Sequence, residues 1–210
     1  MHHLINYPND LLFLVLLCPL FNENNKMNQS ILIYTLPFLL SMDIFFLSIS
    51  GGVTMQPYRW GMTLKNSLIF SVFQAFAGLI AFYLAQLISP LVSDYSALAG
   101  SMFTAYIGLK MMSEAIKVKN EQRTFLIEDI QILWPLALAS SINAFTLFFG
   151  LGFFKIPLQA SLITLFVSIF IISQVGQFIG SHYRPIRIGR SSKFAGGLFI
   201  LVIIIINYIL

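Results

Sequence analysis

Charged residues, cysteine and histidine are all scarce in this chain. Asp, Glu, Lys and Arg make up 10% of its 210 residues and 58% are hydrophobic, whereas soluble domains carry about 25% charged residues. The single cysteine, Cys18, excludes an internal disulfide, a cysteine-ligated zinc site and a CxxC redox pair. We therefore expect an integral membrane protein, surrounded by membrane lipid.

Motifs of several enzyme classes are missing as well. The sequence contains no G-x-x-x-x-G-K-[ST] motif and hence no P-loop for ATP. Its histidines, His2, His3 and His182, lie outside the apolar stretches, which argues against an intramembrane Ser–His hydrolase or a haem carrier. We expect no enzyme activity and no cofactor. The net charge of +4 does not indicate a nucleic-acid partner, because the basic residues lie in the expected loops.

Six apolar stretches are long enough to cross a bilayer, which requires about 20 residues each. The predicted fold is an all-α polytopic membrane protein with six transmembrane helices and short loops. The expected spans are 31–50, 66–88, 97–116, 132–154, 158–180 and 194–210.

Lys and Arg are distributed unevenly among the expected loops. Nine of them fall in the first, third and fifth loops, and two fall on the other side. The positive-inside rule places the three basic loops in the cytoplasm and both termini outside, in a multi-pass protein of the inner membrane. The nine are Arg59, Lys65, Lys117, Lys119, Arg123, Arg184, Arg187, Arg190 and Lys193, and the two are Lys26 and Lys155. Lys110 lies inside the third expected span.

Residues 1–30 form an N-terminal extension ahead of the first span. Its apolar part, residues 11–21, is too short to span a membrane, and no basic segment or small-residue cleavage site marks it as a secretory signal. Met27 is a natural start, so residues 1–26 are interpreted as a misassigned extension. The alternative is a translated, weakly membrane-associated tail.

Two segments one hundred residues apart are near-copies of each other. The sequence SMDIFFL at 41–47 corresponds to SINAFTL at 141–147, and Gln74 corresponds to Gln174. These matches divide the chain into a first transmembrane repeat at 31–116, a cytoplasmic linker at 117–131 and a second repeat at 132–210. Because each repeat has three spans, its two copies must have opposite orientations, as in many transporters.

Asp43 is the first candidate for function, and Asn143 takes its place in the second repeat. A charge at the centre of a membrane helix costs at least about 2.5 kcal/mol and is a functional candidate by default. Asp43 could bind a cation, carry a proton or do both, and Asn143 offers a carbonyl oxygen at the matching position. The alternatives are a hydrogen-bonded structural Asp and an interhelical hydrogen bond from Asn.

Three further residues could line an ion path. Gln74 lies on a face of small and polar residues, which indicates either an ion path or close helix packing. Gln174 is its counterpart in the fifth span. Glu114 is one helical turn from Lys110, so it forms either an intrahelical ion pair or a cytoplasmic binding group for incoming cations.

Several short segments carry a resemblance to a known family. They are LSMD at 40–43, SISGG at 48–52, SLIF at 67–70, GLKMMSE at 108–114, ASSINA at 139–144 and GQFIG at 176–180. Through their order and spacing, residues 28–210 resemble the MntP-type manganese efflux proteins, within the superfamily of LysE-type exporters. The resemblance implies six spans in two inverted triplets, with an acid in the first span and another in the fourth.

The sequence departs from that pattern at two positions. The acid of the fourth span is Asn143, and Gln74 stands where family members often carry Glu. Manganese favours carboxylate, carbonyl and water oxygens, so the resemblance implies Asp43 and Asn143 as its ligands. The expected function is secondary export of a manganese-type divalent cation. The alternatives are export of a monovalent cation or a small amino compound, and a non-transporting membrane subunit. The oligomeric state stays open.

Overall fold

The structure is a computed structural model that describes residues 26–55, 58–117, 129–154, 156–183 and 186–209. Most of the expected N-terminal extension and of the expected linker lies outside these residues. So do four of the basic loop residues: Lys119, Arg123, Lys155 and Arg184.

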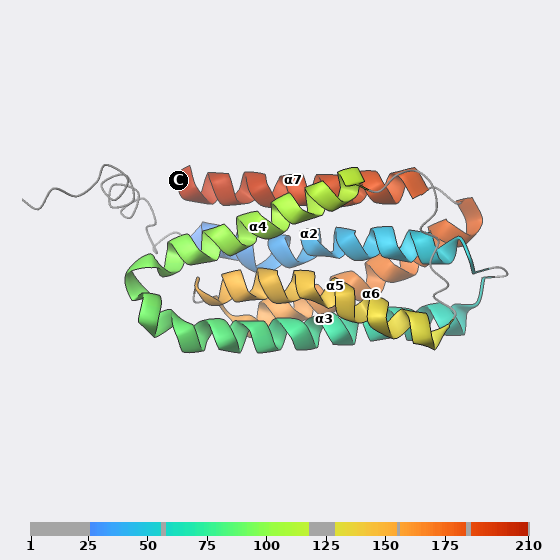
Figure 1. Cartoon of the computed structure of the whole chain (residues 1–210), viewed down its shortest axis with the longest axis horizontal. Helices are drawn as coiled ribbons and strands as arrows, with labels where there is room; N and C mark the ends of the chain where they lie inside the picture. The colour runs from blue at the N-terminus through green and yellow to red at the C-terminus, as the bar shows by residue number, and fades with distance from the viewer. Residues whose placement is uncertain (1–25, 56–57, 118–128, 155, 184–185, 210) are drawn as a thin grey trace, which may run out of the picture.

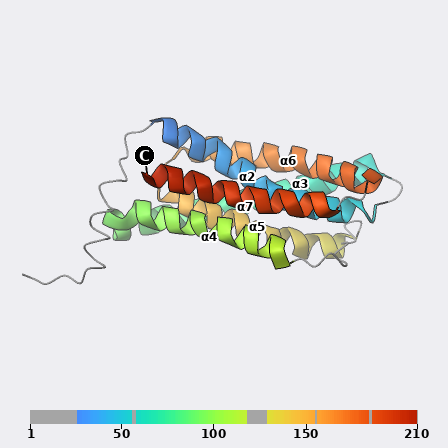
Figure 2. The ribbon, with the colours of Figure 1, turned by 90° about the horizontal axis from the view of Figure 1, so that it is seen from above.

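The helices of the described residues are six long α-helices and one short 3-10 helix. These are α2 (Lys26–Gly52), α3 (Trp60–Ile88), η2 (Ser89–Tyr95), α4 (Ser96–Lys117), α5 (Ile130–Gly152), α6 (Leu158–Tyr183) and α7 (Ile186–Ile209). The α-helices run lengthwise beside one another in one bundle (Figures 1 and 2). In Figure 1 the helix ends that flank the first and fifth loops and the start of α5 lie at the right-hand end, opposite the C-terminus, and α4 ends on the same side but farther in. We call the right-hand end the basic-loop end.

Five of these helices are long and apolar enough to cross a membrane, counted over the described residues. They contribute Leu32–Gly52, Trp60–Val92, Gln131–Gly152, Leu158–Tyr183 and Gly189–Ile206. The remaining long helix, α4, corresponds to the third expected span and carries Lys110, Glu114 and Lys117. Its charges lower its mean hydropathy, although at 22 residues it has the length of a span.

The bundle is apolar both inside and outside. Its centre is filled by fully buried side chains such as Leu36, Ile44, Phe70 and Phe148. Large apolar side chains also cover the outer surface, among them Phe76 on α3 and Ile163 on α6, each more than half exposed. Such an exterior suits lipid rather than water, so the protein is an integral membrane protein.

The packing partners of the helices form a regular pattern. Helix α2 packs chiefly on α6 and α7, α3 packs on α5 and α6, and α4 packs on α7 and α5. Exchanging α2 with α5, α3 with α6 and α4 with α7 reproduces the same set of pairs. Glycines allow the closest approaches: a Cβ on Gly108 would lie 3.0 Å from the carbonyl oxygen of Gly197, and one on Gly197 2.7 Å from that of Gly108.

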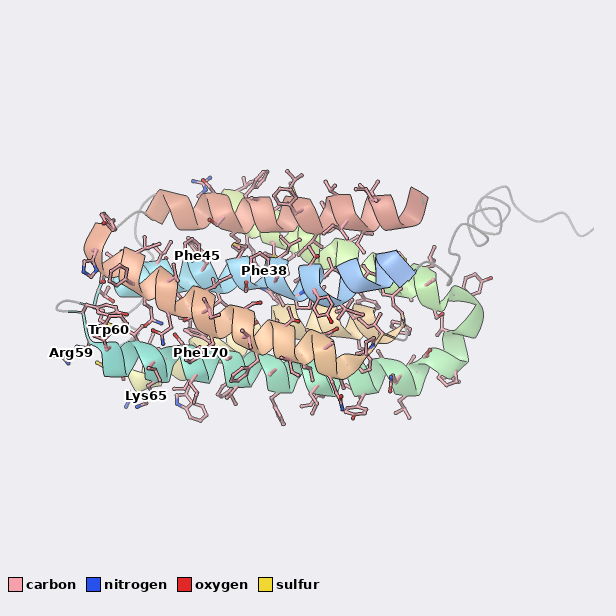
Figure 3. The ribbon with its side chains drawn as sticks, turned by 180° about the vertical axis from the view of Figure 1, so that it is seen from behind. Phe38, Phe45, Arg59, Trp60, Lys65 and Phe170 are labelled. Carbon is pink, nitrogen blue, oxygen red and sulfur yellow. The ribbon has the colours of Figure 1, made fainter. Side chains whose placement is uncertain are left out.

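Three helices begin several residues earlier than expected. Helix α2 starts at Lys26 instead of residue 31, α3 at Trp60 instead of residue 66, and α7 at Ile186 instead of residue 194. Figure 3 shows Arg59, Trp60 and Lys65 at the basic-loop end of α3, where their side chains are exposed. Assigning Lys65, Arg187, Arg190 and Lys193 to loops was wrong, because Lys65 lies inside α3 and the other three lie inside α7. The side chain of Lys193 is only 8% exposed.

Candidate cation site

Asp43 and Asn143 are in direct contact at the centre of the bundle. The side-chain amide of Asn143 donates a hydrogen bond of 2.6 Å to Oδ2 of Asp43. Both residues are buried, at 2% and 4% exposure. The two repeat positions therefore meet between α2 and α5.

Three charged residues complete a closed ring with this pair. Lys193 Nζ lies 2.6 Å from Oδ1 of Asp43 and 2.7 Å from Oε2 of Glu114. Lys110 Nζ lies 2.7 Å from Oδ1 of Asn143 and 3.8 Å from Oε1 of Glu114. We call Asp43, Asn143, Lys110, Glu114 and Lys193 the charge ring. It joins α2, α4, α5 and α7.

The charge ring is electrically neutral, since Asp43 and Glu114 supply −2 and the two lysines supply +2. Pairing is what allows these groups to be buried, because an isolated charge in an apolar interior is very costly. Oδ1 of Asp43 accepts no hydrogen bond of regular geometry, but its 2.6 Å ion pair with Lys193 compensates its charge.

Exposure rises toward one side of the ring. The side chains of Asp43 and Lys193 are 3% and 8% exposed, whereas those of Lys110 and Glu114 are 24% and 37% exposed. Glu114 is only three residues from Lys117, where α4 ends toward the basic-loop end. The ring is therefore closed toward the bundle centre and more open at Glu114.

The intrahelical ion pair between Lys110 and Glu114, one of the two alternatives for Glu114, is present, but it is the longest link of the ring. At 3.8 Å it is weaker than the 2.7 Å contact that Glu114 makes with Lys193 on another helix. The stronger ion pair of Glu114 is therefore the one with Lys193, between α4 and α7.

Gln74 lies beside the ring without belonging to it. Its amide donates a 3.4 Å hydrogen bond to Oγ of Ser140, which precedes Asn143 by about one helical turn on α5. The carbonyl oxygen of Gln74 is buried and accepts no hydrogen bond among the described residues. Such an unsatisfied buried oxygen is uncommon in native structures and requires an explanation.

A second polar cluster, without charge, lies between α2, α3 and α6. Gln177 accepts a hydrogen bond of 3.3 Å from Asn66 and donates bonds of 3.3 Å to Ser67 and 3.1 Å to Ser173. Ser48 on α2 donates to Ser173 at 2.9 Å. Hydrogen bonds between buried side chains of neighbouring membrane helices fix their packing.

Gln174 is half-buried on α6. It takes part in none of the hydrogen bonds that define the charge ring and the second polar cluster. The buried glutamine of this helix is Gln177. Gln177 is buried because its face of α6 packs closely on α2: Cβ atoms on Gly176 and Gly180 would clash with α2. The face of α6 that carries these glycines and Gln177 therefore turns inward.

Sequence reasoning missed Lys193 as a member of the site. The concentration of basic residues around it favoured a loop. One signal points to the buried position: Gly189 and Gly197 stand four residues before and after Lys193, on the same helix face. Cβ atoms at both glycines would press on neighbouring helices, so this face is packed inside the bundle.

No group of three or more His, Cys, Asp or Glu side chains gathers in the part of the chain that the structure describes. The charge ring instead offers oxygens from two carboxylates and one amide, which are the hard ligands that manganese and magnesium accept.

Buried charges inside a bundle of apolar helices are typical of membrane transport proteins. The family model described as "Putative manganese efflux pump" matches residues 57–209. This match includes Asn143 and Lys193 and begins after Asp43. The chain belongs to this family of manganese efflux pumps.

Curated relatives extend across bacteria and archaea, each named "Putative manganese efflux pump MntP". The protein of Mannheimia succiniciproducens is 27% identical over 170 residues, covering 80% of this chain and 90% of its own. That of Phocaeicola vulgatus is 30% identical, covering 81% and 91%, and that of Methanosarcina acetivorans is 30% identical, covering 67% and 75%. No solved structure matches the chain.

Proposed function

We propose that this protein is a secondary transporter that exports manganese from the cell across the inner membrane. Membership of the manganese efflux pump family supports export and its substrate. The observation that carries the site is the contact between Asp43 and Asn143, because it joins a buried carboxylate and a side-chain amide from two helices.

In this proposal Asp43 is the main ligand and Asn143 the second. The unsatisfied carbonyl oxygen of Gln74 on α3 is a candidate third ligand, because the amide of Gln74 binds Ser140, one turn before Asn143 on α5. Glu114 is the group that first meets a cation from the basic-loop end, because its half-buried side chain is the most accessible of the charge ring. Gln174, which is half-buried, would act farther along the path if it takes part.

The transport cycle we propose is alternating access between two inverted three-helix repeats, with α4 as a sixth membrane span. The pairwise packing supports this arrangement, because exchanging the helices of the two triplets reproduces the same list of packing pairs. The basic residues flanking the first, third and fifth loops favour a cytoplasmic location for the basic-loop end and an outer location for the termini.

Metal sensitivity in a host that lacks its own manganese exporter tests this function. Cells that produce the chain should grow at higher external manganese and accumulate less of it than cells with an empty vector. Unchanged manganese content, with the protein present in the membrane, would contradict the proposal. The variant Lys65→Met is a suitable control because this lysine is exposed on α3.

Export of a small amino compound is the second candidate. One observation favours it: two primary ammonium groups, those of Lys110 and Lys193, already occupy the carboxylates and the amide oxygen of the ring. Amine sensitivity that the chain relieves, with manganese content unchanged, would favour this candidate.

A further inference from the structure

We propose that Lys193 is a tethered counter-cation, which holds the carboxylates of Asp43 and Glu114 in the metal-free protein and which the transported divalent cation displaces. This inference rests on the proposed cation transport. It adds a residue that sets the affinity of the site.

The position of the Lys193 ammonium is the first argument. It lies between two carboxylates on different helices, 2.6 Å from Oδ1 of Asp43 on α2 and 2.7 Å from Oε2 of Glu114 on α4. The ring of Phe46 lies 5.7 Å away and adds a cation–π contact. The side chain is 8% exposed. A metal ion that bridges the same two carboxylates would have to take the place of this nitrogen.

Charge balance is the second argument. The two carboxylates carry −2, and either the two lysine ammonium groups or one divalent cation supplies +2. Lysines and metal together would leave an uncompensated +2 in a buried site, which the low dielectric of the interior makes very unfavourable. Binding of a divalent cation therefore requires that ammonium groups leave the carboxylates.

Lys193 is the main competitor of the two lysines. It contacts both carboxylates at 2.7 Å or less, whereas Lys110 approaches Glu114 only to 3.8 Å and otherwise binds the neutral Asn143. Lys193 lies seven residues from Ile186, where α7 begins at the basic-loop end, a rise of about 10 Å along the helix. Its flexible four-carbon chain can turn toward that end when the carboxylates are taken.

Manganese titration of the purified full-length protein in lipid nanodiscs, at fixed pH and ionic strength, tests the inference. The variant Lys193→Met removes the charge and keeps an unbranched apolar chain. We expect it to bind manganese at least about tenfold more tightly than the wild type, equivalent to about 1.4 kcal/mol. Lys193→Arg keeps the cation and should stay within about threefold of the wild type. Lys65→Met, an exposed lysine, should leave the affinity unchanged.

If Lys193→Met is difficult to produce, its yield with and without manganese in the growth medium provides a second test. The variant leaves the carboxylates of Asp43 and Glu114 short of one cation, so manganese in the medium should restore its yield. Failure of manganese to restore it, while Lys193→Arg is produced normally, would overturn the inference.

The inference and the proposed function can fail separately. A wild type that binds manganese, with equal or weaker binding by Lys193→Met, would overturn the role of Lys193 and leave manganese transport standing. Binding by Lys193→Met but not by the wild type would support the role of Lys193 and count against manganese as the native substrate. Absence of binding in both would overturn both.

Discussion

Replacing Asp43 with Asn removes the central carboxylate while keeping its size. The structure predicts two separate effects, on transport and on stability. Transport should be lost, because the proposed site loses its main anionic ligand. Stability should fall, because Lys193 loses the partner 2.6 Å away and is too deeply buried to be solvated by water.

The size of the stability effect follows from the ring. In Asp43→Asn the ring contains Glu114 at −1 and two lysines at +2, which leaves +1. Removing one partner of a buried ion pair typically costs about 3–5 kcal/mol. Glu114 remains 2.7 Å from Lys193, so we expect a loss near the lower limit, about 3 kcal/mol. The double variant Asp43→Asn/Lys193→Met restores a neutral ring and should recover at least about 2 kcal/mol of this loss.

Two measurements separate the effects. Unfolding free energies in mixed detergent micelles, for the wild type, both single variants and the double variant, give the coupling between the two residues. Manganese accumulation in the exporter-deficient host gives transport. An Asp43→Asn protein as stable as the wild type, or a double variant no more stable than Asp43→Asn, would show that the ion pair is not what holds Lys193. If Asp43→Asn exports manganese as well as the wild type does, Asp43 is not a manganese ligand.

Three further predictions concern affinity, packing and topology. Asn143→Asp makes the ring −1 and should bind manganese more tightly in a titration at fixed pH; equal or weaker binding by the folded variant would mean that this position does not share the site. Gly52→Ala should destabilise the protein by about 1–3 kcal/mol, because its Cβ would clash with the α6 backbone, whereas Gly61→Ala, which meets no atom within 4 Å, should not; similar unfolding free energies would refute this. Arg187→Cys in a Cys18→Ser background should label poorly from outside intact cells, and ready labelling would reverse the proposed orientation.

Much of the helical arrangement can be predicted from the sequence, because long apolar stretches have few alternatives in a membrane. The expected helices are present, although α2, α3 and α7 begin several residues early. The offset of one hundred residues also indicated that Asp43 and Asn143 correspond. In the structure, Nδ2 of Asn143 lies 2.6 Å from Oδ2 of Asp43. Their role in transport stays a prediction.

The ring itself could not be predicted, because it depends on contacts between helices that are distant in the sequence. Lys193 and Glu114 are 79 residues apart, and their 2.7 Å contact exists only because α7 packs against α4. Counting the basic residues of each expected loop placed Lys193 in a loop that faces water. It could not detect that two carboxylates from other helices compensate the charge inside the bundle.

The glycine contact between α4 and α7 has a mechanical consequence. Because Gly108 and Gly197 bring the two backbones together, α4 and α7 pack closely as a pair. This pair carries Lys110, Glu114 and Lys193, whose formal charges sum to +1, and it faces Asp43 at −1. Separating the pair from α2 in the metal-free protein would part opposite charges and would require work. In the proposed transport cycle, we therefore expect this attraction to hold α4 and α7 against α2 while the transporter is empty.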